Sequence, residues 1–316
     1  MKPLKIYLML LGFAIFTGAT FNVAKYTVDY FSSFSAAAWR FGLAAVVMLM
    51  ILMVTEGVRK NEFRKNAIAY LVLGIVGIFG FNALFFTGLK YTSPVNGALI
   101  MGLNPLVTTI FAQMILKDKM TTKQAAGIFF AFIGVLLVIT QGSIETVKTL
   151  SISGGDLMIF GGNICWALYG VLGRRFVKDA TPLTATTYPM TIGAVSLIVV
   201  SFFMPKPVPL PTIPIGAWGA VAFMAFFTTV LGYLWWNQGM KEIGASKTSL
   251  FFNLVPVVTM MISFATGTPV SVFQMIGTVF ILLGVLTASG VITIPKHHTE
   301  KRAAVSSYQK SPFSEY

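Results

Sequence analysis

Three residues near position 166 have the spacing of a site on one face of a helix. Asn163 and Tyr169 each lie three residues from Trp166, so a helix would place all three side chains on one side. An amide and a phenol can exchange hydrogen bonds with a small polar molecule, and an indole can contact its apolar part. Two interpretations are open: the patch lines a pathway for a solute, or it packs inside the protein with local hydrogen bonds. The other candidates for the same pathway are Asn22, Asn82, Asn96, Asn104, Tyr233 and Asn253.

Arg40 is the one charge that lies clearly within an apolar segment, residues 34–54. It is about six residues from the outer end of this segment, so at about 1.5 Å per residue it lies roughly 9 Å deep. A guanidinium at this depth can extend outward to the polar boundary of a membrane. We expect a structural or interfacial role for Arg40, and contact with a substrate carboxylate is the alternative.

Pro105 and Pro256 lie near the middle of two further apolar segments. Proline lacks a backbone donor and collides with the carbonyl four residues earlier, which predicts a kink in each helix. A kink can open a cavity or act as a hinge, or it can simply be tolerated in a membrane helix. Asn104 directly precedes Pro105 and Asn253 lies three residues before Pro256, and an amide within hydrocarbon needs a polar partner. We therefore predict hinges at the two prolines, beside the solute pathway.

The sequence has few residues that could support enzymatic or metal chemistry. No histidine lies within an apolar segment, and there is no HExxH pattern and no cluster of metal ligands. Ser246-Lys247-Thr248 resembles part of a phosphate-binding loop, but such a loop needs a glycine directly before the lysine. The sequence therefore predicts that the protein is not an enzyme and has no cofactor and no metal site.

Composition places the chain among membrane proteins. Of its 316 residues, 56% are hydrophobic and 10% are charged, and the mean hydropathy is +0.79. A membrane helix needs about 20 apolar residues, and backbone groups in lipid must be paired internally. Ten segments meet this requirement, at about residues 6–24, 34–54, 67–88, 91–116, 122–140, 157–173, 183–204, 214–238, 248–267 and 272–292.

The sequence contains one pattern of residues twice, with five apolar segments in each copy. Because five is odd, the second copy must enter the membrane from the opposite side. We predict two inverted repeats, residues 1–140 and 141–294, and a disordered cytoplasmic tail, residues 295–316. Glycines seven residues apart share a helix face, and we expect these pairs to let helices approach closely. The recurring residues are Gly88 and Gly239, Pro105 and Pro256, Gln124 and Gln274, Gly127 and Gly277, and Gly134 and Gly284.

Lysine and arginine are distributed unequally between the two sides of the predicted membrane. With a cytoplasmic N-terminus, the only ones of the 23 basic residues on the outer side are Lys25, Lys90, Lys148 and Lys206. This bias predicts that both termini are cytoplasmic. The net charge of +13 then reflects topology and attraction to anionic lipid, and it does not imply a nucleic-acid partner.

The positions of the tryptophans and of the acidic residues bear on the membrane boundaries and on proton coupling. Trp39, Trp218, Trp235 and Trp236 lie near the ends of predicted segments, and we assign them mostly to the interfacial aromatic belts. The 10 acidic residues lie in loops, at segment ends or in the tail, so the pathway lacks an evident proton carrier. We therefore expect a facilitator or exchanger, with Asp156 as the nearest exception.

The arrangement of these features resembles the EamA-like branch of the drug/metabolite transporter superfamily over residues 4–292. The resemblance rests on Trp39-Arg40-Phe41 in the second segment, a proline in the fourth and ninth, and a glycine pair in the fifth and tenth. It implies a bacterial inner-membrane carrier that exports amino acids or related metabolites. It also implies that the fourth, fifth, ninth and tenth helices form a scaffold between the halves.

The sequence thus predicts an all-α membrane protein with ten transmembrane helices in two inverted five-helix repeats. We expect a multi-pass carrier of the plasma membrane that exports an amino acid or related compound by alternating access. Its expected partners are a small-molecule substrate and membrane lipid, and the oligomeric state is left open. The alternatives are a carrier of drug-like or lipid-linked amphiphiles, or a membrane sensor or scaffold that transports nothing.

Overall fold

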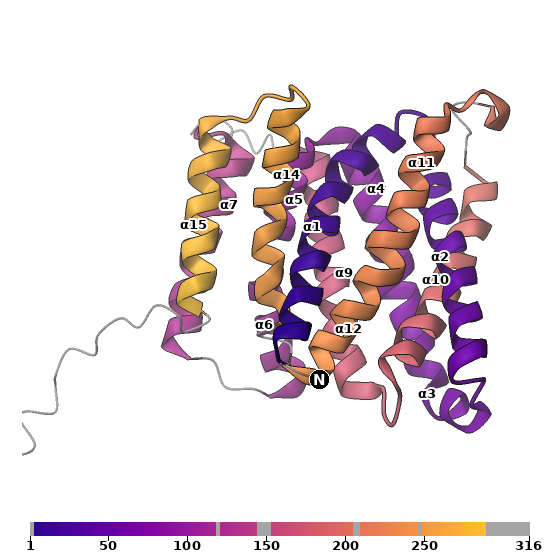
Figure 1. Ribbon diagram of the computed structural model, residues 1–316. Helices are drawn as coiled ribbons and strands as arrows, with labels where there is room; N and C mark the ends of the chain where they lie inside the picture. Colours follow the sequence, from indigo (N-terminus) through magenta and orange to yellow (C-terminus); the bar gives the residue numbers. More distant parts are fainter. Residues whose placement is uncertain (1–2, 118–120, 144–152, 205–208, 245–247, 289–316) are drawn as a thin grey trace, which may run out of the picture.

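The structure is a computed structural model that describes residues 3–117, 121–143, 153–204, 209–244 and 248–288. Within these ranges every regular element is a helix and no strand occurs. The helices lie roughly parallel or antiparallel to one another in a bundle (Figure 1). The predicted tail, residues 295–316, lies outside the described residues. The all-helical prediction is confirmed for the described part of the chain.

The elements before residue 141 begin with α1 (Pro3–Thr27) and α2 (Ser33–Thr55). A continuous helix follows, made of α3 (Lys60–Val72), the π-helical segment η1 (Leu73–Gly80) and α4 (Phe81–Tyr91). The remaining elements of this part are α5 (Pro94–Met101), α6 (Asn104–Leu116) and α7 (Thr122–Thr140).

The elements after residue 152 begin with α9 (Gly154–Phe176), α10 (Pro182–Phe202) and the short 3-10 turn η2 (Leu210–Thr212). A second continuous helix combines α11 (Ile215–Phe223), the π-helical segment η3 (Met224–Leu231) and α12 (Gly232–Glu242). The chain then forms the 3-10 turn η4 (Leu250–Asn253), α14 (Leu254–Ala265) and α15 (Val272–Ala288).

Seven helical segments in the described residues are long and apolar enough to cross a membrane. The other three predicted spans correspond to shorter apolar helices, at Ala125–Val138, Phe251–Ala265 and Val272–Gly284.

Serine, threonine and proline residues determine where several of the helices begin. Ser93 directly precedes Pro94 at the start of α5, and its side chain accepts a hydrogen bond from the backbone amide of Asn96. Thr181 directly precedes Pro182 at the start of α10 and forms a capping box with Thr184.

The two π-helical segments occupy matching places in the chain. Each has eight residues, follows an α-helix without a break and leads into an eleven-residue helix, α4 or α12. Gly88 and Gly239 are each the eighth residue of these helices. The two composite helices run in opposite directions through the bundle, from α3 up to α4 and from α11 down to α12 (Figure 1).

The predicted kinks at Pro105 and Pro256 are present as interruptions of the helix. The helix stops at Met101 and resumes at Asn104, so the carbonyl four residues before Pro105 lies at the break. Before Pro256 the chain forms the 3-10 turn η4, and α14 begins two residues before the proline. The two interruptions lie in contact with each other. Gly102, in the first interruption, is so close to Pro256 that a Cβ added to it would lie 3.2 Å from Cγ of the proline.

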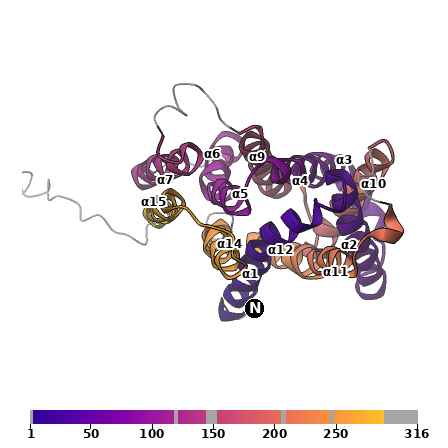
Figure 2. The same cartoon turned by 90° about the horizontal axis from the view of Figure 1, so that it is seen from above.

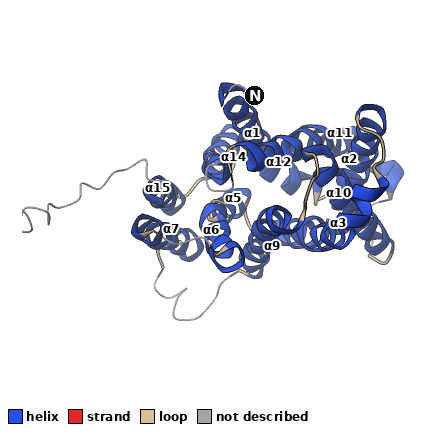
Figure 3. Ribbon diagram, turned by 90° about the horizontal axis from the view of Figure 1, so that it is seen from below, coloured by secondary structure: helices blue, strands red, loops and turns tan. Residues whose placement is uncertain are grey.

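The glycine pairs lie where α7 and α15 contact each other, as predicted. A Cβ added to Gly134 would lie 2.7 Å from the carbonyl oxygen of Gly277, and one added to Gly284 would lie 2.6 Å from that of Gly127. The backbones therefore touch, which supplies the close packing that membrane helices need in place of a hydrophobic driving force. Figures 2 and 3 show the pair at one end of the bundle, with α2, α3, α10 and α11 at the other.

Candidate functional site

The candidate site is a small cavity at the centre of the bundle, which we call the central cavity. Its volume is about 30 Å³. Three of the predicted residues line it: Arg40, Trp166 and Tyr233. This space is enough for a water molecule but not for a metabolite, whose sites usually measure about 300 Å³ or more. The centre of the protein is therefore closed in this structure.

Trp166 is the hub of an aromatic cluster beside the central cavity. Its ring centroid lies 4.9 Å from that of Tyr233, 5.3 Å from Phe81, 5.5 Å from Tyr169 and 5.6 Å from Trp236. These rings come from α4, α9 and α12, so three separate helices build the cluster. Such an assembly offers apolar surface and polarisable ring faces to a ligand.

Arg40 does not extend to the membrane boundary, and this part of the prediction was wrong. The residue is only 3% exposed, and its Nε donates a hydrogen bond to Oγ1 of Thr229 at 2.8 Å. Its Cζ lies 5.0 Å from the ring centroid of Phe41 and 5.9 Å from that of Phe86. The guanidinium points inward because η3 provides a polar acceptor there and aromatic rings cover it.

The π-helical geometry of η3 positions the partner of Arg40. The hydroxyl of Thr229 donates to the carbonyl of Met224, five residues earlier, at 2.9 Å, which leaves its oxygen free to accept from Arg40. The adjacent Thr228 forms a 2.6 Å hydrogen bond with Thr20 of α1. A π-helical segment thus turns two successive hydroxyls into the centre of the bundle.

Unsatisfied polar atoms are also present at the central cavity. Within the described ranges, neither Nε1 of Trp166 nor Oγ1 of Thr17 has a hydrogen-bond partner, and both residues line the cavity. Tyr233 is buried beside Arg40 and Asn82. A buried donor without a partner costs free energy, so these groups favour a polar occupant.

Tyr169 forms the polar edge of the cluster together with Asn237, a residue that the sequence analysis missed. Nδ2 of Asn237 donates to the Tyr169 hydroxyl at 3.1 Å and to Oγ1 of Thr186 at 2.7 Å. Asn237 lay one residue from the predicted end of its span, where a polar residue is unremarkable. The helix in fact continues to Glu242, which places Asn237 inside the bundle.

The helix extension also corrects the assignment of Trp236 to an interfacial belt. Trp236 is 2% exposed and packs against Phe13 at 5.0 Å and Phe252 at 5.2 Å, next to Trp166. Trp39, by contrast, is 40% exposed and meets Trp218 edge to face at 5.1 Å.

Most of the predicted asparagines bind other helices and do not reach the central cavity. Asn104 donates to Asn163 at 2.9 Å, and Asn163 donates to the carbonyl of Ile100 at 2.8 Å. These amides thus join α9 to the interruption between α5 and α6. The remaining contacts are Asn22 with Thr259 and Ser263, Asn96 with Gln274, and Asn82 with the carbonyl of Ile78, while Asn253 lies buried at the start of α14.

Several larger cavities lie away from the centre of the described part of the protein, and two of them bear on function. One, of about 270 Å³, lies against α9, α10 and α12 and reaches Tyr169 and Asn237. The other, of about 640 Å³, is a mainly apolar groove along α2 and α10. Its exposed lining includes Leu43, Val46 and Met50, which offer nothing to recognise a polar metabolite.

The fold and the site define a polytopic helical membrane protein with a polar, aromatic centre, and sequence comparison assigns its class. The profile of the EamA-like transporter family matches residues 4–140 and 153–290, and the chain belongs to this family. It is a member of a family of membrane transporters.

Individual relatives agree with this assignment. The chain is 78% identical to the uncharacterized transporter YyaM of Bacillus subtilis (strain 168), across 96% of this chain and all of that protein. It is 24% identical to an uncharacterized transporter of Archaeoglobus fulgidus, across 89% of this chain and 98% of that one. A solved crystal structure with 21% sequence identity has the same fold, with a TM-score of 0.66 over 90% of this chain and 96% of that chain.

Proposed function

We propose that the protein is a carrier that exports an amino acid or a related carboxylate-bearing metabolite by alternating access. One observation carries this proposal: Arg40 is buried beside the central cavity and, among the residues that the structure describes, no Asp or Glu side chain lies within ion-pair distance of it. A buried charge is costly unless it is paired, so the site favours an anionic group. The aromatic cluster around Trp166 would take the rest of the molecule.

The proposal includes ten transmembrane helices in two inverted repeats, with units at residues 1–140 and 141–294. Three features support it: the π-helical segments in matching places, the opposite directions of the two composite helices, and the interruptions before Pro105 and Pro256. Interrupted helices next to a central site are common in carriers of this design. We propose the two interruptions as the hinges.

The test of the proposed function is metabolite profiling of the medium from cells that overproduce the protein. A compound that accumulates outside should then be transported by purified protein in proteoliposomes. The carrier proposal is wrong if wild-type overproduction and an Arg40→Met variant at equal expression leave the same metabolites in the medium.

We expect Trp166→Ala to lower the apparent affinity for the exported compound about ten-fold or more, because a large buried ring contact is lost. Asn104→Ala is the matched comparison, since Asn104 bonds to Asn163 and lies away from the central cavity. It should reduce thermal stability and leave the KM for transport nearly unchanged. Equal effects of the two substitutions on KM would show that Trp166 has no special role.

Both termini are proposed to be cytoplasmic in the plasma membrane. Cysteines introduced singly at Ser143 and Asn61, with Cys165 replaced by alanine, should react with a membrane-impermeant thiol reagent from opposite sides. We expect labelling of Ser143→Cys in intact cells and of Asn61→Cys only after the membrane is opened. The reverse labelling pattern would show that the topology is opposite to the proposed one.

Transport is expected to run without proton coupling. Asp156 is the carboxylate buried at the outer end of α9, and it accepts a hydrogen bond from Thr92. Counterflow of the exported compound in proteoliposomes should persist without a proton gradient, and a gradient should not drive accumulation of a neutral zwitterion. Uphill uptake that is abolished both by a protonophore and by Asp156→Asn would overturn this expectation.

A second candidate function is the transport of drug-like or lipid-linked amphiphiles. The observation in its favour is the apolar groove of about 640 Å³ along α2 and α10, which is large enough for an acyl chain or a ring system. In the same export assay this candidate predicts loss of flux when Gly42 in the groove is replaced by Trp. The metabolite proposal predicts normal flux for that variant.

A further inference from the structure

The cavity of about 270 Å³ against α9, α10 and α12 combines positive charge at its mouth with a polar floor; we call it the α9–α12 vestibule. Arg174 and Lys241 line it, and both are exposed near the ends of their helices. Tyr169 and Asn237 also line it, and their hydrogen bond closes it toward the centre. With the proposed topology, the vestibule opens to the cytoplasm.

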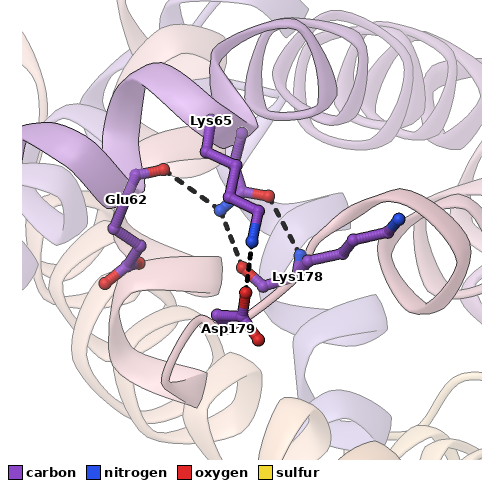
Figure 4. Close-up of polar contacts among 5 residues, drawn as sticks. Glu62, Lys65, Lys178 and Asp179 are labelled. Atoms are coloured by element: carbon purple, nitrogen blue, oxygen red, sulfur yellow. Dashed lines mark hydrogen bonds and ion pairs between the residues drawn. The ribbon is translucent and has the colours of Figure 1, made fainter.

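The single acidic residue that lines the vestibule is already paired. Asp179, in the loop between α9 and α10, forms an ion pair with Lys65 of α3 (Figure 4). This hydrogen-bonded lysine lowers the pKa of Asp179, so its carboxylate stays charged and held by Lys65. In the part of the chain that is described, no carboxylate lies within ion-pair distance of Arg174 or Lys241. The vestibule therefore carries uncompensated positive charge.

Two hydrogen bonds with the side chain of Asn66 hold the loop that carries Asp179 in place. The amide of Lys178 donates to the side-chain oxygen of Asn66 at 2.9 Å, and Nδ2 of Asn66 donates to the carbonyl of Lys178 at 2.9 Å. Asn66 is 2% exposed, so these bonds are protected from water. Because α3 thereby fixes the loop, Asp179 stays beside Lys65.

The floor of the vestibule is one aromatic ring away from the central cavity. The Tyr169 ring stacks on Trp166 with centroids 5.5 Å apart, and Trp166 lines the central cavity while Tyr169 lines the vestibule. Asn237 ties Tyr169 to Thr186 of α10 through hydrogen bonds of 3.1 and 2.7 Å. The two cavities thus lie in series on either side of this hydrogen-bonded barrier.

We propose that the α9–α12 vestibule is a loading site that binds the anionic group of the substrate before the substrate passes Tyr169. This inference rests on the proposed carrier function. It specifies that the cytoplasmic side of the carrier selects substrates with a negative charge. A cleft lined by one sign of charge raises the local concentration of oppositely charged solutes. The vestibule volume approaches the lower end of small-molecule sites, and Leu73 and Met240 supply apolar contact for the rest of the molecule.

Positive charge at the cytoplasmic ends of helices also follows from membrane topology alone, so the test needs matched cations. Arg175 and Lys178 lie at the same end of α9 and do not line the vestibule. Replacing these two by glutamine removes the same charge from the same side of the membrane. Any effect specific to Arg174 and Lys241 then belongs to the vestibule.

The first experiment measures the electrostatic potential in the vestibule without a known substrate. Full-length protein with Cys165→Ala and Ala185→Cys is labelled with methanethiosulfonates that carry a sulfonate or a trimethylammonium group. The sulfonate reagent should react faster, relative to a free thiol, than the ammonium reagent. Arg174→Gln with Lys241→Gln should lower this ratio about ten-fold, and Arg175→Gln with Lys178→Gln should change it less than two-fold. Equal effects of the two pairs would overturn the proposal.

The second experiment tests occupancy with probes of equal size and different charge. Phenylacetate should slow labelling of Ala185→Cys, phenethylamine should not, and the Arg174→Gln, Lys241→Gln pair should abolish the protection. Nanodiscs of phosphatidylcholine and of phosphatidylglycerol separate a soluble anion from a lipid headgroup. Protection by phosphatidylglycerol without added probe, or equal protection by both probes, would overturn a loading site for a soluble anion.

These outcomes are independent of whether export is detected. A positive labelling pattern with no flux for any metabolite would leave the vestibule as an anion site and disprove the carrier proposal. Flux that is insensitive to Arg174→Gln and Lys241→Gln, together with an unchanged labelling ratio, would keep the carrier and disprove the loading site. When the carrier function and the loading site are both correct, Arg174→Gln together with Lys241→Gln should raise the KM for substrate supplied on the cytoplasmic side several-fold. The maximal rate should stay unchanged.

Discussion

Arg40→Met is expected to reduce export about 100-fold or more while leaving the protein at least as stable as the wild type. A charge-assisted contact in a desolvated site contributes about 2 to 5 kcal/mol to binding, and a loss of about 3 kcal/mol or more corresponds to this reduction. Removal of an unpaired buried cation also removes its desolvation cost, so thermal stability should rise or stay the same. Flux in proteoliposomes and the Tm in detergent measure the two effects.

Two comparisons separate a binding role of Arg40 from a structural one. Arg40→Lys keeps the charge but loses the fork of donors, and it should retain part of the flux. Thr229→Val removes the acceptor of the Nε hydrogen bond and should cost less than either Arg40 substitution. If Arg40→Met lowers the Tm by several degrees and transports normally, the guanidinium serves the fold and the carboxylate proposal fails.

Gly134→Ala and Gly284→Ala are each expected to lower the free energy of unfolding by about 1 to 3 kcal/mol. In both cases the new methyl group would meet a backbone carbonyl of the facing helix at 2.6 to 2.7 Å, so α7 and α15 must separate. Backbone cannot move aside as a flexible side chain can. Unfolding of the purified protein in mixed detergent micelles, followed by far-UV circular dichroism, measures the change.

Gly219 is the control for the glycine prediction. It lies in α11, is exposed, and a Cβ added there would meet nothing within 4 Å. Gly219→Ala should therefore be neutral or stabilise by up to about 1 kcal/mol, because it removes only the flexibility of glycine. If all three substitutions behave alike, the contact between α7 and α15 is not limiting for stability.

Much of the helical framework follows from local sequence. Apolar runs of sufficient length indicate helices, and the clash of a proline with the carbonyl four residues earlier places the interruptions before Pro105 and Pro256. The glycine pairs indicate a close helix contact because only small residues permit it. Trp166 and Tyr233 stand out because polar aromatic residues are unusual in the middle of an apolar segment.

The contents of the central cavity depend on features that local sequence does not carry. A π-helical turn holds more residues than an α-helical one, so beyond η3 a projection with 3.6 residues per turn misplaces Asn237. Likewise, Asn104 is a plausible substrate ligand until its bond to Asn163 is known, and that partner lies on a helix distant in sequence. Arg40 points inward for the same reason, since its acceptor Thr229 belongs to η3.

The contact between α7 and α15 sets an order of events during synthesis. The glycine face of α7, at residues 122–140, finds its partner only when residues 272–288 have been made. At about 5 to 20 residues per second the ribosome needs roughly 7 to 30 seconds for this stretch. During that time the small residues of α7 face lipid or the insertion machinery, and any other helix with a similar face can occupy them. Correct assembly of the carrier is therefore completed by its last described helix, and truncation before α15 should leave a chain that inserts but stays open to degradation.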